Sequence, residues 1–117
     1  MKVLVCGGRD FANKELLWNC LDKICEEGGI SEIIHGGAPG ADSLAGEYAS
    51  ERGVPEIIFP ADWKRFGSFA GRLRNSQMLQ EGQPDLILEM PGGKGTFHMV
   101  SISRGAGKKV RSWDGFG

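Results

Sequence analysis

The chain lacks the features that mark several large classes of protein. None of its apolar runs approaches about 18 residues, so the sequence predicts no membrane-spanning helix. No signal-peptide pattern follows Met1 and Lys2, and we expect a cytoplasmic protein. The 14 basic and 15 acidic side chains leave a net charge of −1, which argues against general attraction to membranes and makes nucleic acid an unlikely partner.

Cysteine is scarce as well. Cys6, Cys20 and Cys25 are odd in number and lack the spacing of metal ligands. We therefore expect reduced, mostly buried thiols in the cytoplasm, with no metal site and no resident cofactor.

Two familiar phosphate-binding fingerprints are missing. The segment 7–10, Gly-Gly-Arg-Asp, lacks the third glycine of the Gly-x-Gly-x-x-Gly dinucleotide motif. Lys94 precedes Gly95 instead of following the glycines of a Walker A loop, so magnesium-dependent hydrolysis of a nucleoside triphosphate is not supported.

What the chain does have is three glycine-rich turns, each directly after a short apolar run. The turns span 6–10, 35–42 and 91–96, and the apolar runs before them span 3–5, 33–34 and 86–88. In a parallel α/β sheet such turns open on the same edge, where glycine lets the backbone approach a ligand and a helix N-terminus offers N–H groups to an anion. Three of them together predict a phosphate-bearing ligand, and a nucleotide fits best.

Apolar runs alternate with segments of helical period along the whole chain. Strands are expected at 3–6, 30–35, 56–59, 85–89 and 109–112, and helices at 13–27, 41–52, 68–81 and 95–105. This alternation predicts one α/β domain over 1–112, a Rossmann-like three-layer sandwich with a mostly parallel sheet of about five strands. The strand order should reverse beside the first strand and place the ligand there. We expect a loop at 60–67 and a loosely ordered tail or interface patch at 113–117.

Several side chains in the first two turns allow more than one interpretation. Arg9 suits a bidentate bond to phosphate, or a local surface pair with Asp10. Asp42 is either a helix cap or a carboxylate directed into the crevice. His35 is either a hydrogen-bonded structural residue or an acid–base group.

Further candidates follow in the second half of the chain. Trp63 is suited to base stacking, or to packing in the core or against a helix, and Arg74 can reach phosphate or ribose. Asn75, the next residue on the same helix, should point in another direction. The turn at 91–96 combines backbone N–H groups, a threonine hydroxyl and a helix N-terminus, which makes it the best phosphate cradle of the three.

The expected ligand contacts are Gly7, Gly8, Arg9, Asp10, Gly36, Gly37, Ala38, Asp42, Trp63, Arg74, Asn75, Pro91, Gly92, Gly93, Lys94, Gly95 and Thr96. Any catalytic group is unknown, with Arg74, Asp42 and Asp10 as candidates.

These motifs, in this order, resemble the SLOG superfamily, and within it the YspA-like, YpsA-related domains. The superfamily also includes the lonely-guy phosphoribohydrolases and the DNA-processing protein DprA. The matching stretches are 6–11, 35–38, 42–45, 60–63, 70–71 with 74–75 and Met78, and 91–96. The resemblance implies a Rossmann-like fold and a nucleotide-type ligand, and it leaves the activity open.

The phosphoribohydrolases carry the motif Pro-Gly-Gly-x-Gly-Thr-x-x-Glu, in which the glutamate acts in cleavage of the N-glycosidic bond. Met99 occupies that position here, and a thioether carries no proton. The family's catalytic arginine corresponds to Arg74, followed four residues on by Met78. His98 lies about 100° from Met99 around the helix, so it is a poor direct substitute.

Three functions therefore remain open for the sequence. We expect a binder of a nucleotide or an ADP-ribose-like molecule that acts as a sensor or a sequestering domain. The alternative is a nucleotide N-glycosidase that releases base and ribose phosphate. DNA binding has little support, because the chain has no run of basic residues. Because related sites are often built near a dimer contact, a homodimer is also expected.

Overall fold

The computed structural model describes residues 1–116 and has a five-stranded parallel sheet at its centre. The strands are β1 (Lys2–Cys6), β2 (Glu32–His35), β3 (Glu56–Ile58), β4 (Leu86–Glu89) and β5 (Lys109–Ser112). Their spatial order is β3-β2-β1-β4-β5, and every neighbouring pair is parallel. The predicted α/β class, strand number and parallel pairing are confirmed.

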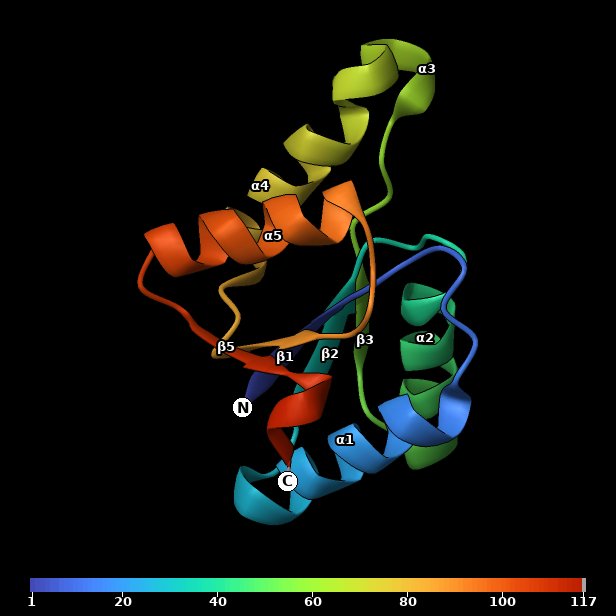
Figure 1. Ribbon diagram of the computed structural model, residues 1–117, viewed down its shortest axis with the longest axis vertical. Helices are drawn as coiled ribbons and strands as arrows, with labels where there is room; N and C mark the ends of the chain where they lie inside the picture. Colours follow the sequence, from blue (N-terminus) through green and yellow to red (C-terminus); the bar gives the residue numbers. More distant parts are fainter. Residues whose placement is uncertain (117) are drawn as a thin grey trace.

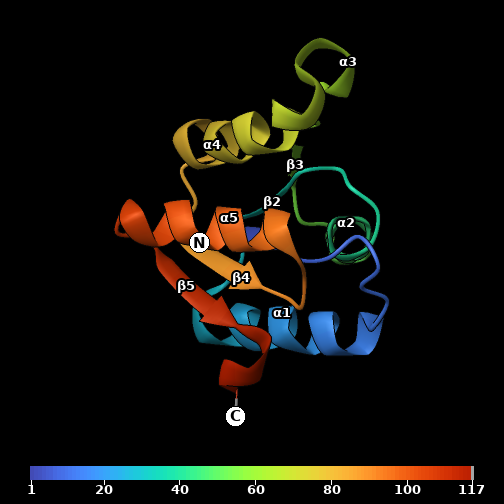
Figure 2. The same cartoon turned by 45° about the horizontal axis from the view of Figure 1, so that its top comes forward.

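Helices cover both faces of this sheet. The α-helices are α1 (Lys14–Gly28), α2 (Ala41–Arg52), α3 (Trp63–Phe66), α4 (Ala70–Gly82) and α5 (Lys94–Gly105), and the 3₁₀ helices are η1 (Gly67–Phe69) and η2 (Trp113–Phe116). Figures 1 and 2 show α1 and α2 on one side of the sheet, α4 and α5 on the other, and α3 projecting at the far end of α4. These are the three layers of a Rossmann-like sandwich. No helix among the described residues has the length and apolar character needed to cross a membrane.

The two cores follow from the alternation of side chains along the central strands. On β1, Val3 and Val5 pack toward α1 and α2, whereas Leu4 and Cys6 pack toward α4 and α5. Because β1 is buried on both faces, its sequence is a continuous apolar run instead of an alternation of apolar and polar residues. On α1 the buried positions Leu17, Cys20, Leu21 and Ile24 recur at helical spacing, and Asn13 accepts a hydrogen bond from the Leu16 amide to cap its first turn.

The strand order reverses beside β1, as predicted. β1 pairs with β2 on one side and with β4 on the other, so the helices that follow β1 and β4 lie on opposite faces of the sheet. The three glycine-rich turns leave the carboxyl ends of β1, β2 and β4 at this point. Such a reversal opens a crevice between neighbouring loops, where α/β proteins bind ligands.

The region expected as a loop at 60–67 folds differently. Asp62 accepts a hydrogen bond from the Arg65 amide (3.1 Å), and this cap starts the single turn of α3. The 3₁₀ helix η1 then leads into α4 at Ala70, two residues later than the sequence predicted. A helix of four residues is too short to show an apolar period, so the only sequence signal for α3 is its capping residue, Asp62.

The tail is better ordered than expected. Trp113–Phe116 form η2, which packs against α1, where Lys23 Nζ donates to the Phe116 carbonyl (3.0 Å). The Arg111 guanidinium lies 3.8 Å from the centre of the Phe116 ring. The prediction of loose order at 113–117 is therefore wrong for 113–116, and Gly117 lies outside the described residues.

Candidate functional site

The three glycine-rich turns, α4 and the start of α5 enclose a cleft of about 970 Å³. It lies at the carboxyl edge of the sheet, where the strand order reverses. The predicted contacts that line it are Gly7, Gly8, Arg9, Asp10, Ala38, Asp42, Trp63, Arg74, Asn75, Pro91, Gly92, Gly93, Lys94, Gly95 and Thr96. Gly36 and Gly37 are not part of its lining.

Some of these glycines are required by the way the turns pack on one another. The Gly8 amide donates to the Pro91 carbonyl (2.8 Å), and the Gly8 carbonyl accepts from the Ala41 amide (3.2 Å). A side chain at Gly40 would collide with the Gly8 carbonyl, and one at Gly92 would come within 2.7 Å of the Gly8 amide nitrogen. These positions need glycine for close backbone approach, whether or not a ligand is bound.

Gly93 and Gly95 differ from the others, because a Cβ atom at either position would meet nothing within 4 Å. Gly93 is the N-cap of α5, and no side chain bonds the free N–H groups of the first turn. The first backbone bond of the helix runs from the Phe97 amide to the Gly93 carbonyl (3.0 Å). An uncapped N-terminus of a 12-residue helix therefore opens into the cleft, where its N–H groups and helix dipole favour an anion.

Asp42 lies in the first turn of α2, but it does not cap that helix. The N-cap is Gly40, and Asp42 Oδ2 instead accepts from the amides of Gly36 (3.1 Å) and Ala38 (3.2 Å). The capping interpretation is therefore wrong, and the amides of Gly36 and Ala38 are already paired within the chain. Burial raises the pKa of the Asp42 carboxyl above its ordinary value, although these hydrogen bonds and the charge of Arg74 act in the opposite direction.

His35 is a structural residue. Its Nδ1 accepts from the Gly37 amide (2.9 Å), which leaves the ring proton on Nε2, 2.6 Å from Glu56 Oε2. The imidazole is buried and lies outside the cleft lining. It joins the end of β2 to β3 and fixes the turn that follows.

Arg74 and Asn75 act together, although the sequence suggested that they diverge. Arg74 donates from Nη1 to the Gly36 carbonyl (2.7 Å) and from Nε to Asn75 Oδ1 (3.2 Å). Asn75 is only 6% exposed and donates from Nδ2 to the Gly95 carbonyl (3.2 Å) and to His98 Nδ1 (3.1 Å). One polar network thus connects the second turn, α4 and the start of α5. Burial lowers the pKa of Arg74, and the Asp42 carboxylate opposes that shift.

Arg9 and Trp63 form one wall of the cleft. The Arg9 guanidinium lies 5.5 Å from the centre of the Trp63 ring, a cation–π arrangement, and both residues line the cleft. Among the described residues Arg9 makes no ion pair with Asp10. Trp63 is 49% exposed, so it is not a core residue, but its ring lies against α4, where a Cβ added at Gly71 would come within 3.3 Å of it. The helix-packing interpretation is therefore supported, and the exposed part of the ring is accessible for stacking.

Met99 packs in the core and is also one of the residues that line the cleft. It is 1% exposed and packs with Leu4, Ile34 and Val100 between the sheet and α5. The position that carries glutamate in the phosphoribohydrolases is therefore filled here by an apolar side chain.

Eleven residues that line the cleft were not among the predicted contacts, and Ser68, Gly71, Arg72 and His98 are four of them. The others are Val5, Cys6, Phe11, Ala12, Asn13, Met78 and Met99. The signal for His98 was its spacing, because it lies four residues after Lys94 and so on the same face of α5. Within 1–116 no cluster of three or more His, Cys, Asp or Glu side chains has the arrangement of a metal site.

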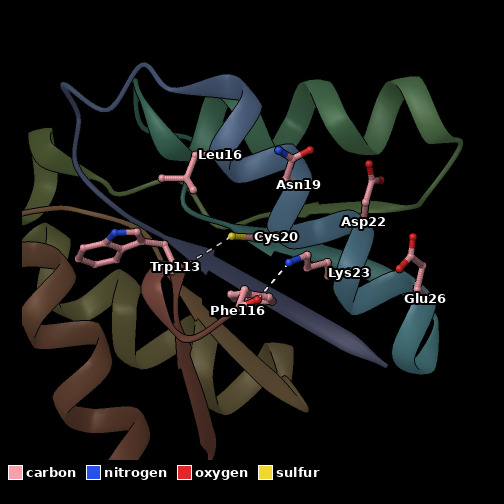
Figure 3. A pocket seen from close by; sticks show the side chains of 8 residues that line it. All are labelled: Leu16, Asn19, Cys20, Asp22, Lys23, Glu26, Trp113 and Phe116. Carbon is pink, nitrogen blue, oxygen red and sulfur yellow. Dashed lines mark hydrogen bonds between the residues drawn. The ribbon is translucent and has the colours of Figure 1, made fainter.

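A second, smaller cavity of about 490 Å³ lies between α1 and η2 (Figure 3). Trp113 and Phe116 face Cys20 and Lys23 across it. The polar contacts drawn there close the C-terminal segment onto α1, with Cys20 Sγ 4.0 Å from the Trp113 carbonyl oxygen. No glycine-rich turn or helix N-terminus is among its lining residues, so the larger cleft is the candidate site.

Comparison with known proteins supports the resemblance to the SLOG superfamily. Residues 1–66 match the YAcAr family, described as the YspA, cpYpsA-related SLOG family. The chain belongs to this family. It is also 34% identical to the Gene 61 protein of Mycobacterium phage D29, over 93% of each chain. The SLOG match includes the first two turns and Trp63, whereas the similarity to the phage protein spans nearly the whole chain. Membership of this family is consistent with a nucleotide-related function.

Proposed function

We propose that the protein binds a nucleotide or an ADP-ribose-like molecule in the cleft, as a sensor or a sequestering domain. The observation that carries the proposal is the uncapped N-terminus of α5, whose first turn faces a 970 Å³ cleft through Gly93 and Gly95. A phosphoryl group suits this position because backbone N–H groups and the helix dipole both favour negative charge.

The surroundings of this anion site fit the remainder of a nucleotide. Basic side chains line the cleft on several sides: Arg9, Arg72, Arg74 and Lys94. The exposed Trp63 ring supplies an apolar surface for a base at one wall. Asp42 offers Oδ1, which has no hydrogen-bond partner among the described residues, as an acceptor for a ribose hydroxyl.

The alternative function is hydrolysis of a nucleotide N-glycosidic bond, and the buried Asp42 favours it. A carboxyl group with a raised pKa in a cleft suits a general acid or base. In this reaction water adds to the anomeric carbon, the bond to the base breaks, and the base leaves with a proton. Asp42 already bonds two amides, and Met99 replaces the family's glutamate, so binding without turnover is the better supported function.

Isothermal titration with AMP and with ADP-ribose, followed by chromatography of the mixtures, separates these functions. Binding with the nucleotide recovered intact supports the sensor or sequestering role. Release of a free base supports the glycosidase. Failure of both nucleotides to bind contradicts the proposed function.

We also propose a cytoplasmic location and a homodimer. Cys6, Cys20 and Cys25 are all free thiols, which suits a reducing compartment. Large apolar side chains are exposed beside the cleft on η1, α4 and α5, namely Phe69, Leu73 and Phe97. Such exposure is typical of a contact surface. The molar mass in solution, measured by light scattering, tests the dimer, and a monomer at micromolar concentration contradicts it.

A further inference from the structure

The chain has two histidines, and only one of them is available to a ligand. His35 uses both ring nitrogens within the protein, on the Gly37 amide and on Glu56. His98 lines the cleft, one helical turn after Lys94 on the face of α5 that continues from the anion site. Only its Nδ1 has a partner among the described residues, which is Asn75 Nδ2 at 3.1 Å.

The network around Asn75 determines which nitrogen of His98 carries the proton. A guanidinium has no acceptor, so the Arg74 Nε contact requires an oxygen at Asn75 Oδ1. The amide orientation is thereby fixed, and Asn75 Nδ2 donates to the Gly95 carbonyl and to His98 Nδ1. His98 Nδ1 must then carry the lone pair. The neutral ring consequently has its proton on Nε2, the nitrogen without a partner in residues 1–116.

We propose that His98 contacts the ligand as a hydrogen-bond donor, giving Nε2–H to an acceptor oxygen of a phosphate ester bound at the start of α5. This inference rests on the proposed function and makes it more specific. The ligand must present an acceptor at this point, such as a phosphoryl or ribose ring oxygen. Asn75 is a positioning residue for His98, and Arg74 positions Asn75 in turn.

The charges around the ring support a neutral donor. Burial and the positive charge of Arg72 lower the pKa of His98 below its ordinary value, so the imidazole is neutral at pH 7. The charged side chains that line the cleft are Arg9, Asp10, Asp42, Arg72, Arg74 and Lys94. The basic ones outnumber the acidic ones, and this excess disfavours a second proton on the ring. The hydrogen bond that Nδ1 accepts from Asn75 acts in the same direction.

The first test needs no ligand. Nitrogen-15 NMR of the wild-type protein distinguishes a protonated ring nitrogen from one that carries a lone pair, and the variant His98→Gln assigns the signals. We expect His98 as a single tautomer protonated at Nε2. In Asn75→Ala this preference should give way to a mixture of both tautomers, while His35 stays unchanged. A His98 ring protonated at Nδ1 in the wild type overturns the inference.

The second test measures affinity for AMP. His98→Phe keeps a planar ring but has no donor, and we expect it to weaken AMP binding about tenfold, which corresponds to about 1.4 kcal/mol. His98→Gln retains an amide donor of similar reach and should restore most of that loss. Equal AMP affinity in the wild type and in His98→Phe overturns the proposed contact of His98 with the ligand but leaves the proposed function standing. Absence of both AMP and ADP-ribose binding to the wild type overturns the proposed function, and this inference with it.

Discussion

An aspartate at Gly93 should leave the fold intact and remove the anion site. The position accepts a side chain, because its Cβ would meet nothing within 4 Å and its φ of −109° lies outside the left-handed region. Aspartate is a good N-cap, and its charge suits a helix N-terminus, so we expect the free energy of unfolding to stay level or rise by up to about 1 kcal/mol. The same carboxylate would occupy the N–H groups that the phosphoryl group needs and would repel it. Loss of about 2–3 kcal/mol of charge-assisted bonding lowers the affinity for AMP roughly 30- to 150-fold.

The matched control is Gly105→Asp. It places the same charge at the other end of α5, where an added Cβ also meets nothing within 4 Å. An acidic residue near a helix C-terminus opposes the dipole, so this variant should lose up to about 1 kcal/mol of stability and keep its affinity for AMP. Urea denaturation and isothermal titration give both quantities. If Gly93→Asp binds AMP as tightly as the wild type, the nucleotide does not use the N-terminus of α5, and the argument from the uncapped helix fails.

Three more predictions follow from the network and the core. Arg74→Ala should cost about 1.5–3 kcal/mol of AMP binding, because we propose that its guanidinium binds the phosphate, and about 1 kcal/mol of stability, because it loses the hydrogen bond to the Gly36 carbonyl. Arg74→Lys, which keeps the charge, should bind AMP better than the alanine variant in the same titration. Met99→Glu should destabilise the fold by more than about 3 kcal/mol in urea denaturation, since the side chain is 1% exposed, whereas Met99→Leu should be nearly neutral. A glutamate variant as stable as the wild type would contradict the core-packing role of Met99. The pKa of His98 is lower in the folded than in the unfolded chain, so the unfolded state binds more protons below about pH 6.5, and stability falls as the pH drops through that range. His98→Gln should therefore lose less stability than the wild type between pH 7 and 5.5. Equal losses in the two proteins would contradict a lowered pKa of His98.

The fold could be predicted from the sequence because its signals are local and repeated. Each apolar run that became a strand is short and lies close to a glycine or a proline. Among the long helices, α1 and α5 have a clear apolar period, and a glycine lies at the end of each of the four. Parallel pairing then followed from the alternation of these elements. The positions of the three turns at one edge of the sheet followed as well, because the carboxyl ends of parallel strands share that edge.

The roles of individual polar side chains could not be predicted, because they depend on partners far apart in the chain. Asp42 has the sequence position of a cap, yet Gly40 lets the turn fold back so that Asp42 bonds the Gly36 and Ala38 amides. His98 gains its role only when α4 and α5 pack together and bring Asn75 beside it. A single sequence predicts which face of a helix each residue lies on, but it does not predict which helix packs against that face.

The same limit applies to the glycines. From the sequence, all three turns are suited to a ligand, and the turn at 91–96 is the best phosphate cradle of the three, but the pattern does not separate one glycine from another within a turn. In the structure, Gly40 and Gly92 are needed by the packing of the turns themselves, and Gly93 and Gly95 have open space before them. Gly93 and Gly95, which the packing of the turns does not require, therefore support the proposed anion site more specifically than the glycine-rich pattern does.

The measurement that tests the central claim most directly is the thermal unfolding of the wild type and of Gly93→Asp in increasing AMP and ADP-ribose. At about 100 times the dissociation constant, a bound nucleotide stabilises the wild-type fold by roughly 2.7 kcal/mol, which raises the melting temperature by several degrees in a domain of this size. We predict that one of these nucleotides stabilises the wild type and fails to stabilise Gly93→Asp. A melting temperature of the wild type that stays constant with both nucleotides, or one that rises equally in the variant, would contradict a nucleotide site at the start of α5.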